Sequence, residues 1–126
     1  MRLFRDKFVV PEMIAEQIKH RKYFAIIMSP KKRGIEIFPL LGDSLVYVHI
    51  VAEGYTELAS EILNIFTDTF KPLTMISEML DDGSSVWDIY FDYEEVGSEV
   101  MELKSKFMLK NVKKIEVSRI SYTRVV

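Results

Sequence analysis

The sequence predicts a single α+β domain in which two helices cover one face of an antiparallel sheet. Residues 86–93 alternate between large apolar and polar side chains, the period-two pattern of a strand with one buried face. Residues 45–52 are apolar on both faces, which is typical of a central strand. An amphipathic segment with helical periodicity follows each of these two strands. Together these observations predict a sheet with helices on one side.

The first 44 residues are expected to extend this domain with a helix and a β-hairpin. The helix is predicted from Pro11, because proline suits a first helical position. Two short apolar runs, residues 24–28 and 35–38, then predict the hairpin, and the turn between them is basic. Its basic residues are Lys31, Lys32 and Arg33. We interpret this basic tip as solvated surface, and contact with an anion or a nucleic acid is the alternative.

The chain then continues from the central strand into a turn and a helix. The turn reads Glu53, Gly54, Tyr55 and Thr56. Thr56 is expected to cap the helix, in which apolar residues recur at spacings of three and four until the chain reaches Pro72. A strand over residues 73–80 follows, and Gly83 provides the positive φ of the hairpin turn that leads to residues 86–93.

A second helix and a last strand complete the order. Ser98 is expected to cap the helix, whose lysines gather in its C-terminal half, as the helix dipole favours. A strand is predicted over residues 113–120. The order strand-helix-strand-strand-helix-strand is that of the ferredoxin-like βαββαβ unit, a four-stranded antiparallel sheet with two helices on one face. We therefore expect one domain over residues 1–126, made of an extension (1–44) and a ferredoxin-like core (45–120).

The core resembles the ACT family of regulatory domains, which bind amino acids or similar effectors and usually dimerise. The resemblance covers residues 45–120 and is carried by the element order, by the exit of the first strand through Glu53 and Gly54, and by the helix from Thr56. The family's acidic-x-Pro-Gly turn is absent from this chain. The resemblance implies a small-molecule effector near helix N-terminal amides, which favour a carboxylate. The site would comprise Glu53, Gly54, Tyr55 and Thr56.

The polar side of the strongest predicted strand is interpreted as a contact face. It carries Asp88, Tyr90 and Asp92. An RNA-recognition sheet is the alternative, because Tyr90 together with Tyr47 or His49 would make a stacking platform. The two aspartates beside that platform repel phosphate, so we expect no nucleic-acid partner. Apolar residues that the two helices leave uncovered predict instead a homo-oligomer, or an interaction module without a ligand.

Composition and motifs exclude several functional classes. The chain has no cysteine and two histidines, so it offers neither a thiolate metal site nor a site of three histidine ligands. It contains no glycine-rich phosphate loop and no nucleophile motif. Four acidic residues in close succession are interpreted as a solvated strand edge rather than as ligands of a divalent cation. They are Asp88, Asp92, Glu94 and Glu95. We therefore expect no catalytic residues, no metal and no cofactor.

Hydropathy and composition also bear on location. No apolar run approaches the roughly 20 residues that span a bilayer, and the charged N-terminus does not resemble a secretory signal. We therefore expect a cytoplasmic protein without membrane contact. The scarcity of amide side chains and the absence of cysteine resemble the composition of heat-adapted proteins.

Charge is distributed unevenly along the chain. Residues 1–34 hold nine Lys or Arg against three Asp or Glu, residues 35–103 hold one against fifteen, and residues 104–126 hold seven against one. Such asymmetry predicts that the basic ends lie near the acidic middle, either within one subunit or across an interface.

Overall fold

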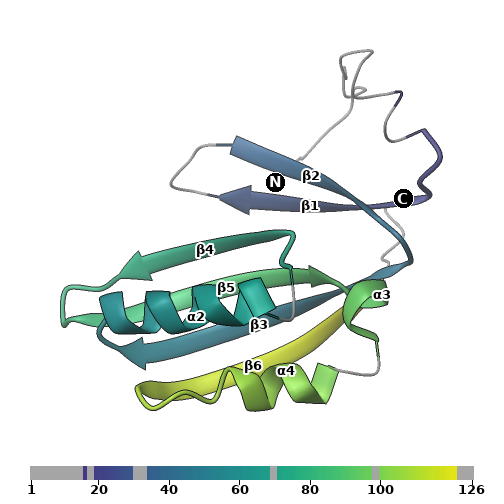
Figure 1. Cartoon of the computed structure of the whole chain (residues 1–126). Coiled ribbons are helices and arrows are strands. Elements are labelled where there is room, and N and C mark those ends of the chain that lie inside the picture. Colours follow the sequence, from purple (N-terminus) through teal and green to yellow (C-terminus); the bar gives the residue numbers. More distant parts are fainter. Residues whose placement is uncertain (1–15, 17–18, 30–33, 69–70, 98–99, 122–126) are drawn as a thin grey trace.

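The computed structural model describes residues 16, 19–29, 34–68, 71–97 and 100–121, and within them the chain is a mixed α+β protein with two antiparallel sheets (Figure 1). The smaller sheet pairs β1 (Tyr23–Ser29) with β2 (Gly34–Leu40). The larger has the spatial order β4 (Thr74–Met79), β5 (Ser84–Asp92), β3 (Ser44–Glu53), β6 (Val112–Ser121). The helices are α2 (Thr56–Asp68), α3 (Tyr93–Val96) and α4 (Val100–Lys106).

The two most strand-like segments of the sequence form the centre of the larger sheet, as predicted. Val48 of β3 pairs with Ile89 of β5 on one side and with Val117 of β6 on the other. Residues 45–52, the apolar run of the sequence, thus lie in a strand that has hydrogen-bonded neighbours along both of its edges.

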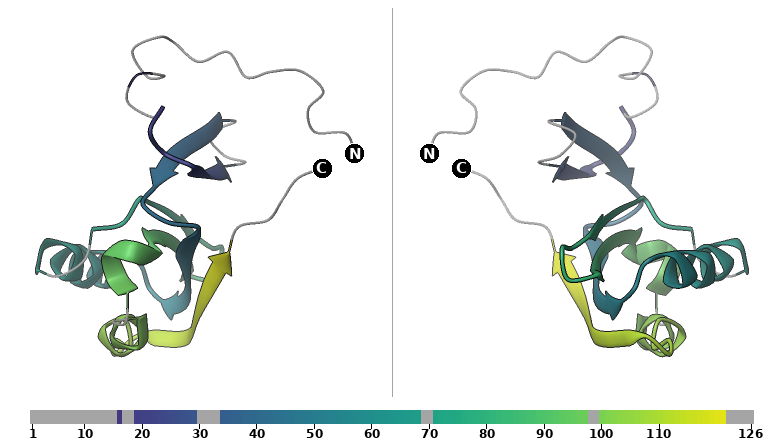
Figure 2. Two further views of the ribbon diagram at one scale, coloured as in Figure 1. Left: turned by 90° about the vertical axis from the view of Figure 1, so that its right-hand side faces the viewer. Right: turned by 90° about the vertical axis from the view of Figure 1, so that its left-hand side faces the viewer.

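The core lies between the larger sheet and the two longer helices. Alternate residues of β3 and β5 are fully buried, together with the inward residues of α2 and of the α4 segment. They include Val46, Val48, Ile50, Trp87, Ile89, Phe91, Leu58, Ile62, Leu103 and Phe107. Because residues of both helices belong to this one cluster, α2 and α4 cover the same face of the sheet (Figure 2).

The indole of Trp87 shows how this core tolerates a polar group. Its Nε1–H donates to the Ser85 hydroxyl over 2.8 Å, and that hydroxyl donates to the carbonyl of Gly54 over 2.6 Å. The ring stacks on Tyr55 at a centroid separation of 4.9 Å. A buried donor that finds a partner avoids the desolvation cost of an unpaired group, so this tryptophan contributes its full apolar area.

The structure corrects the end of the strongest strand. A strand was expected through Tyr93, but β5 ends at Asp92 and Tyr93 begins the short helix α3. The carboxylate of Asp92 accepts the backbone N–H of Glu94 over 3.0 Å, and Gly97 ends the helix with a positive φ of 50°. An N-cap and a glycine with positive φ together bound a single helical turn.

Two N-terminal predictions have different outcomes. The predicted hairpin is present, with Ile26 opposite Ile37. The helix predicted from Pro11 and the basic tip of Lys31, Lys32 and Arg33 lie outside the described residues, apart from Glu16, which is helical. Within the described ranges no helix is long and apolar enough to cross a membrane.

Candidate functional site

The candidate site lies on the open face of the larger sheet, which we define as the face opposite α2 and α4. It carries the residues of β3 and β5 that alternate with the buried ones. The strand register sets Tyr47 opposite Tyr90 and His49 opposite Asp88. These four residues, the open-face cluster, are each partly exposed. They form one contiguous group because the register aligns two neighbouring cross-strand pairs.

One oxygen of Asp88 organises the open-face cluster. Asp88 Oδ1 accepts a hydrogen bond from the Tyr47 hydroxyl and lies 2.8 Å from His49 Nδ1. The Tyr47 hydroxyl lies 3.2 Å from the same ring nitrogen. The Tyr47 and Tyr90 rings stack at 5.1 Å with an interplanar angle of 25°. The carboxylate therefore holds two aromatic side chains in place, and a third packs on them.

Burial and the charge of Asp88 shape the protonation of this cluster. Burial, followed by the hydrogen bond to Asp88, raises the pKa of Tyr47 well above its ordinary value. Burial and then the nearby Asp88 charge also raise the pKa of Tyr90. Both phenols are therefore neutral at physiological pH and present O–H groups rather than phenolates.

A charged pair borders the open-face cluster on β6. Glu116 is the cross-strand neighbour of His49, and its carboxylate lies 3.0 Å from Lys114 Nζ. The hydrogen bond from Lys114 and the lysine charge lower the pKa of Glu116, with a smaller contribution from His49. On the opposite side the register sets Ile76 of β4 beside Asp88. The open face thus combines an aromatic centre, apolar neighbours and a charged margin, as protein interfaces do.

The open-face cluster pairs an aspartate with a histidine. An aspartate that orients a histidine also occurs in hydrolytic triads, but those require a nucleophile beside the imidazole. The hydroxyl nearest to His49 is that of Tyr47, which already donates to Asp88 and has a raised pKa. Within the described residues no group of three or more His, Cys, Asp or Glu is arranged to hold a metal ion.

The structure separates the three residues of the predicted contact face. Asp88 and Tyr90 belong to the open-face cluster, whereas Asp92 is buried with 3% exposure. Its Oδ2 accepts the backbone N–H of Leu41 over 2.9 Å, while its Oδ1 caps α3. Asp92 therefore anchors the chain before β3 to the end of β5, a structural role that its alternation with Asp88 and Tyr90 does not reveal.

The predicted effector turn lies at the opposite end of β3. A hollow of about 260 Å³ is lined there by Glu53, Gly54, Asp82, Gly83, Ser84 and Lys113. The N–H of Gly54 donates to the carbonyl of Gly83 over 3.1 Å, which joins the two turns. We call this the tip hollow. Sequence reasoning found two of its six lining residues, Glu53 and Gly54, because residues 81–84 approach residues 53–54 only through the pairing of β3 with β5.

The other two residues of that predicted site have different surroundings. The ring of Tyr55 packs on Trp87, and its hydroxyl lies 2.8 Å from the Ser77 hydroxyl. Thr56 is exposed and is the first residue of α2. Neither of these two residues lines the tip hollow.

Asp82, which does line the tip hollow, is hydrogen-bonded within its own turn. Its carboxylate accepts the N–H of Ser84 over 2.9 Å, and the hydrogen bonds from Ser84 lower the pKa of Asp82.

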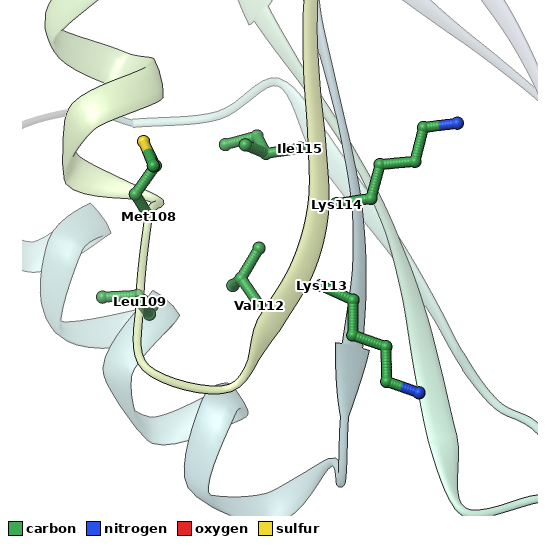
Figure 3. Close-up of a pocket in the computed structure, with 6 residues that line it drawn as sticks. All are labelled: Met108, Leu109, Val112, Lys113, Lys114 and Ile115. Carbon is green, nitrogen blue, oxygen red and sulfur yellow. The ribbon is translucent and has the colours of Figure 1, made fainter.

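A further small hollow, of about 140 Å³, lies between β6 and the chain that follows α4 (Figure 3). Leu109, Val112 and Ile115 lie on its inner side and pack against the core. Lys113 and Lys114 point away on the other side of the strand (Figure 3). This hollow lies at the margin of the core, and its inner wall is apolar.

Tyr47 and His49 were expected beside Tyr90 only as the alternative stacking platform, and their contacts with Asp88 were not predicted. Asp88 is 39 residues away from His49, and only the register of β3 against β5 brings the two together. No protein family model, no curated protein and no solved structure matches this chain.

Proposed function

We propose that this chain is a non-enzymatic assembly module with a ferredoxin-like core, ACT-like in its element order, that works as a homo-oligomer and presents its open face to a protein partner. The strand order β4-β5-β3-β6, with a helix after β3 and a helix before β6, supports the ferredoxin-like assignment. An uncovered sheet face in such a fold is available for binding.

The open-face cluster is the observation that carries this proposal. Asp88 holds Tyr47 and His49, and Tyr90 stacks on Tyr47, yet the side chains of His49 and Asp88 retain 25% and 30% exposure. Tyrosines held rigid before binding lose little conformational entropy on association, and tyrosine is enriched among residues that dominate interface energies. A preorganised, partly exposed aromatic group of this kind suits recognition of another protein surface.

The same geometry argues against catalysis as the function. His49 faces a carboxylate on either side, Asp88 on β5 and Glu116 on β6, and both are acceptors. A general base in this position needs a substrate proton or a nucleophile within hydrogen-bond reach. The tyrosine hydroxyl in reach is already committed to Asp88. All four side chains of the open-face cluster could contact a protein partner, whereas catalysis would use His49 alone.

Sedimentation velocity tests the homo-oligomer. We expect a species larger than the 14.7 kDa monomer at micromolar concentration, and a monomer alone would overturn this part of the proposal. The open face is tested by selecting peptides from a displayed library on the wild-type chain and measuring their binding to Tyr90→Ala. Met79→Ala, which changes an exposed side chain at the end of β4, is the matched control. Peptides that bind all three proteins equally would count against the open face.

A small-molecule effector is the second candidate function, and the tip hollow favours it. Lys113 Nζ lies 3.8 Å from Glu53 Oε1 at its rim, so a cation and a carboxylate are both available to a zwitterion such as an amino acid. A thermal-shift screen with amino acids and nucleotides tests it, because a ligand at about 100 times its Kd adds roughly 2.7 kcal/mol of stability. The stabilisation should be lost in Lys113→Ala and kept in Lys114→Ala.

A further inference from the structure

The β1–β2 hairpin has the composition of strands that are buried on both faces. Within β1 and β2 one residue, Glu36, is charged. On one face of the hairpin Ala25, Ile27 and Leu40 are buried. A strand that is covered on one face and wet on the other alternates apolar and polar residues, whereas these strands are apolar on both sides. The pattern therefore indicates that the second face also becomes covered.

That second face is exposed in the single chain. We call it the hairpin face, and it consists of Phe24, Ile26, Met28, Ile35 and Ile37, with exposed fractions between 39% and 66%. The register sets Ile26 opposite Ile37 and Met28 opposite Ile35, so the five side chains form one patch. Isolated two-stranded ribbons are marginally stable in water and gain stability by packing against another surface.

The size of the hairpin face fits the centre of a protein interface. At roughly 200 Å² for a large side chain, the five exposed fractions correspond to roughly 500 Å² of apolar surface. A groove of about 560 Å³ continues this surface, since Phe24 and Ile26 line it together with Leu45 and Ile120 of the larger sheet. The hairpin face by itself is smaller than the roughly 800 Å² per partner of a stable complex, and the groove adds further surface beside it.

The absence of charge from the hairpin face points to a second copy of the same surface. Glu36, the one charged residue of β1 and β2, pairs with Ile27 and therefore lies on the opposite, covered face. A two-fold interface brings the same patch of both subunits together, so any charge at its centre would meet its own copy. An uncharged apolar patch is self-complementary, and two small sheets pack face to face without polar pairing.

We infer that two copies of this chain dimerise by packing their hairpin faces together around a two-fold axis near the Ile26–Ile37 pair. The inference rests on the homo-oligomer of the proposed function and names the surface that forms it.

Sedimentation velocity of charged variants tests the contact. Ile26→Lys and Ile37→Lys place a cation at the centre of the hairpin face, where it would meet its two-fold copy. Both side chains are exposed in the single chain, so each variant should fold with the wild-type circular dichroism spectrum. We expect the dimer dissociation constant to rise at least about tenfold in each. Met79→Lys, which alters a side chain that is 63% exposed outside the patch, should remain dimeric.

Disulfide trapping gives an independent readout, because the chain has no cysteine of its own. Ile37→Cys places one thiol near the expected axis, so mild oxidation should link two subunits of the folded protein. Met79→Cys should stay unlinked under the same conditions. Efficient linkage of Ile37→Cys, together with monomeric Ile26→Lys, is the result that supports the inference.

The outcomes separate this inference from the assembly proposal on which it rests. A wild-type protein that is monomeric at micromolar concentration overturns both. A wild-type dimer that survives Ile26→Lys and Ile37→Lys unchanged overturns the hairpin contact alone. In that case dissociation by Tyr90→Ala would assign the dimer contact to the open face instead.

Discussion

The two faces of the larger sheet are built from the same strands and differ in what their residues do. On the face under α2 and α4, Trp87, Ile89 and Phe91 are almost fully buried, with exposures of 0–1%. One residue away along β5, Asp88 and Tyr90 remain partly exposed and form the open-face cluster. Residues that alternate along one strand therefore differ in burial: one set packs in the core, and the other remains partly exposed.

This division predicts that the two faces respond differently to substitution. Changes under the helices should reduce the free energy of unfolding strongly, because they remove packed apolar area. Changes on the open face should have small effects on stability and larger effects on binding and on tyrosine ionisation. Trp87→Ala and Asp88→Asn test this contrast directly, and Asp92→Ala and Lys113→Ala extend it to the buried anchor and the tip hollow. They follow in decreasing order of the expected effect on stability.

Trp87→Ala should have the largest effect, lowering the free energy of unfolding by about 3–5 kcal/mol. The indole is buried, stacks on Tyr55 and satisfies its N–H through Ser85, so truncation leaves a cavity and removes these contacts. Urea denaturation followed by circular dichroism measures the change. Tyr90→Ala, on the open face, should cost clearly less. Equal losses for the two variants would contradict the division between the faces.

Asp92→Ala should come next, with a loss of about 1–3 kcal/mol. The side chain is buried and accepts the backbone N–H groups of Leu41 and Glu94, which the alanine variant leaves without this acceptor. Thermal and urea unfolding measure the loss. Asp81→Ala, at an exposed turn position, is the matched control and should stay within about 0.5 kcal/mol of wild type. Equal losses of unfolding free energy in Asp92→Ala and Asp81→Ala would contradict the anchoring role of Asp92.

Asp88→Asn should change ionisation more than stability. Burial is the largest cause of the raised pKa of Tyr47, and the hydrogen bond and charge of Asp88 raise it further. A neutral amide in place of Asp88 should therefore lower that pKa toward the ordinary value of 10.0. Absorbance at 295 nm during an alkaline titration follows the phenolate. Tyr47→Phe identifies the transition that belongs to Tyr47. A Tyr47 transition that does not move in Asp88→Asn would show that burial alone sets the shift.

The raised pKa also predicts how stability depends on pH. Because the folded pKa of Tyr47 exceeds the unfolded one, its contribution is complete below about pH 10 and is lost as pH rises toward the folded value. The free energy of unfolding should therefore fall with pH above about 10 in the wild-type protein. The free energy of unfolding should fall less steeply with pH in Tyr47→Phe. Lysine deprotonation affects both proteins equally, so the difference between them reports Tyr47.

Lys113→Ala should have the smallest effect on stability, within about 0.5 kcal/mol. Its partner Glu53 is 3.8 Å away, and both side chains are about half exposed or more. Thermal unfolding without ligand measures this, with Lys114→Ala as the control. A loss of several kcal/mol would mean that the tip hollow supports the fold, and ligand effects there could then not be read from this variant.

Much of the fold could be predicted because its signals are local. The alternation along residues 86–93 and the apolar run over 45–52 identified the two central strands, and the spacing after Thr56 identified α2. The hairpin followed from two short apolar runs. The exception is the end of β5, where Asp92 turned the chain into α3. The carboxylate that caps this helix also holds Leu41, and that second partner is distant in sequence.

The candidate site was predictable in smaller part. Asp88 and Tyr90 were singled out from their place on the polar side of a strand. Tyr47 and His49 join them only through the register of β3 and β5. The tip hollow likewise combines the predicted turn at Glu53 with the separate turn at Asp82. In both places, the residues that the structure adds to the site are set by which residues lie opposite one another across two strands.

By itself the sequence determined which side of each strand is apolar, where the longer helix begins and that the chain has no thiol chemistry. These are properties of neighbouring residues and of composition. The tertiary structure decided that Asp88 meets His49, that Asp92 is buried and that the hairpin keeps one apolar face exposed. The reason is physical: side-chain alternation is set within a strand, whereas register and burial are set by the packing of segments that lie far apart in the chain.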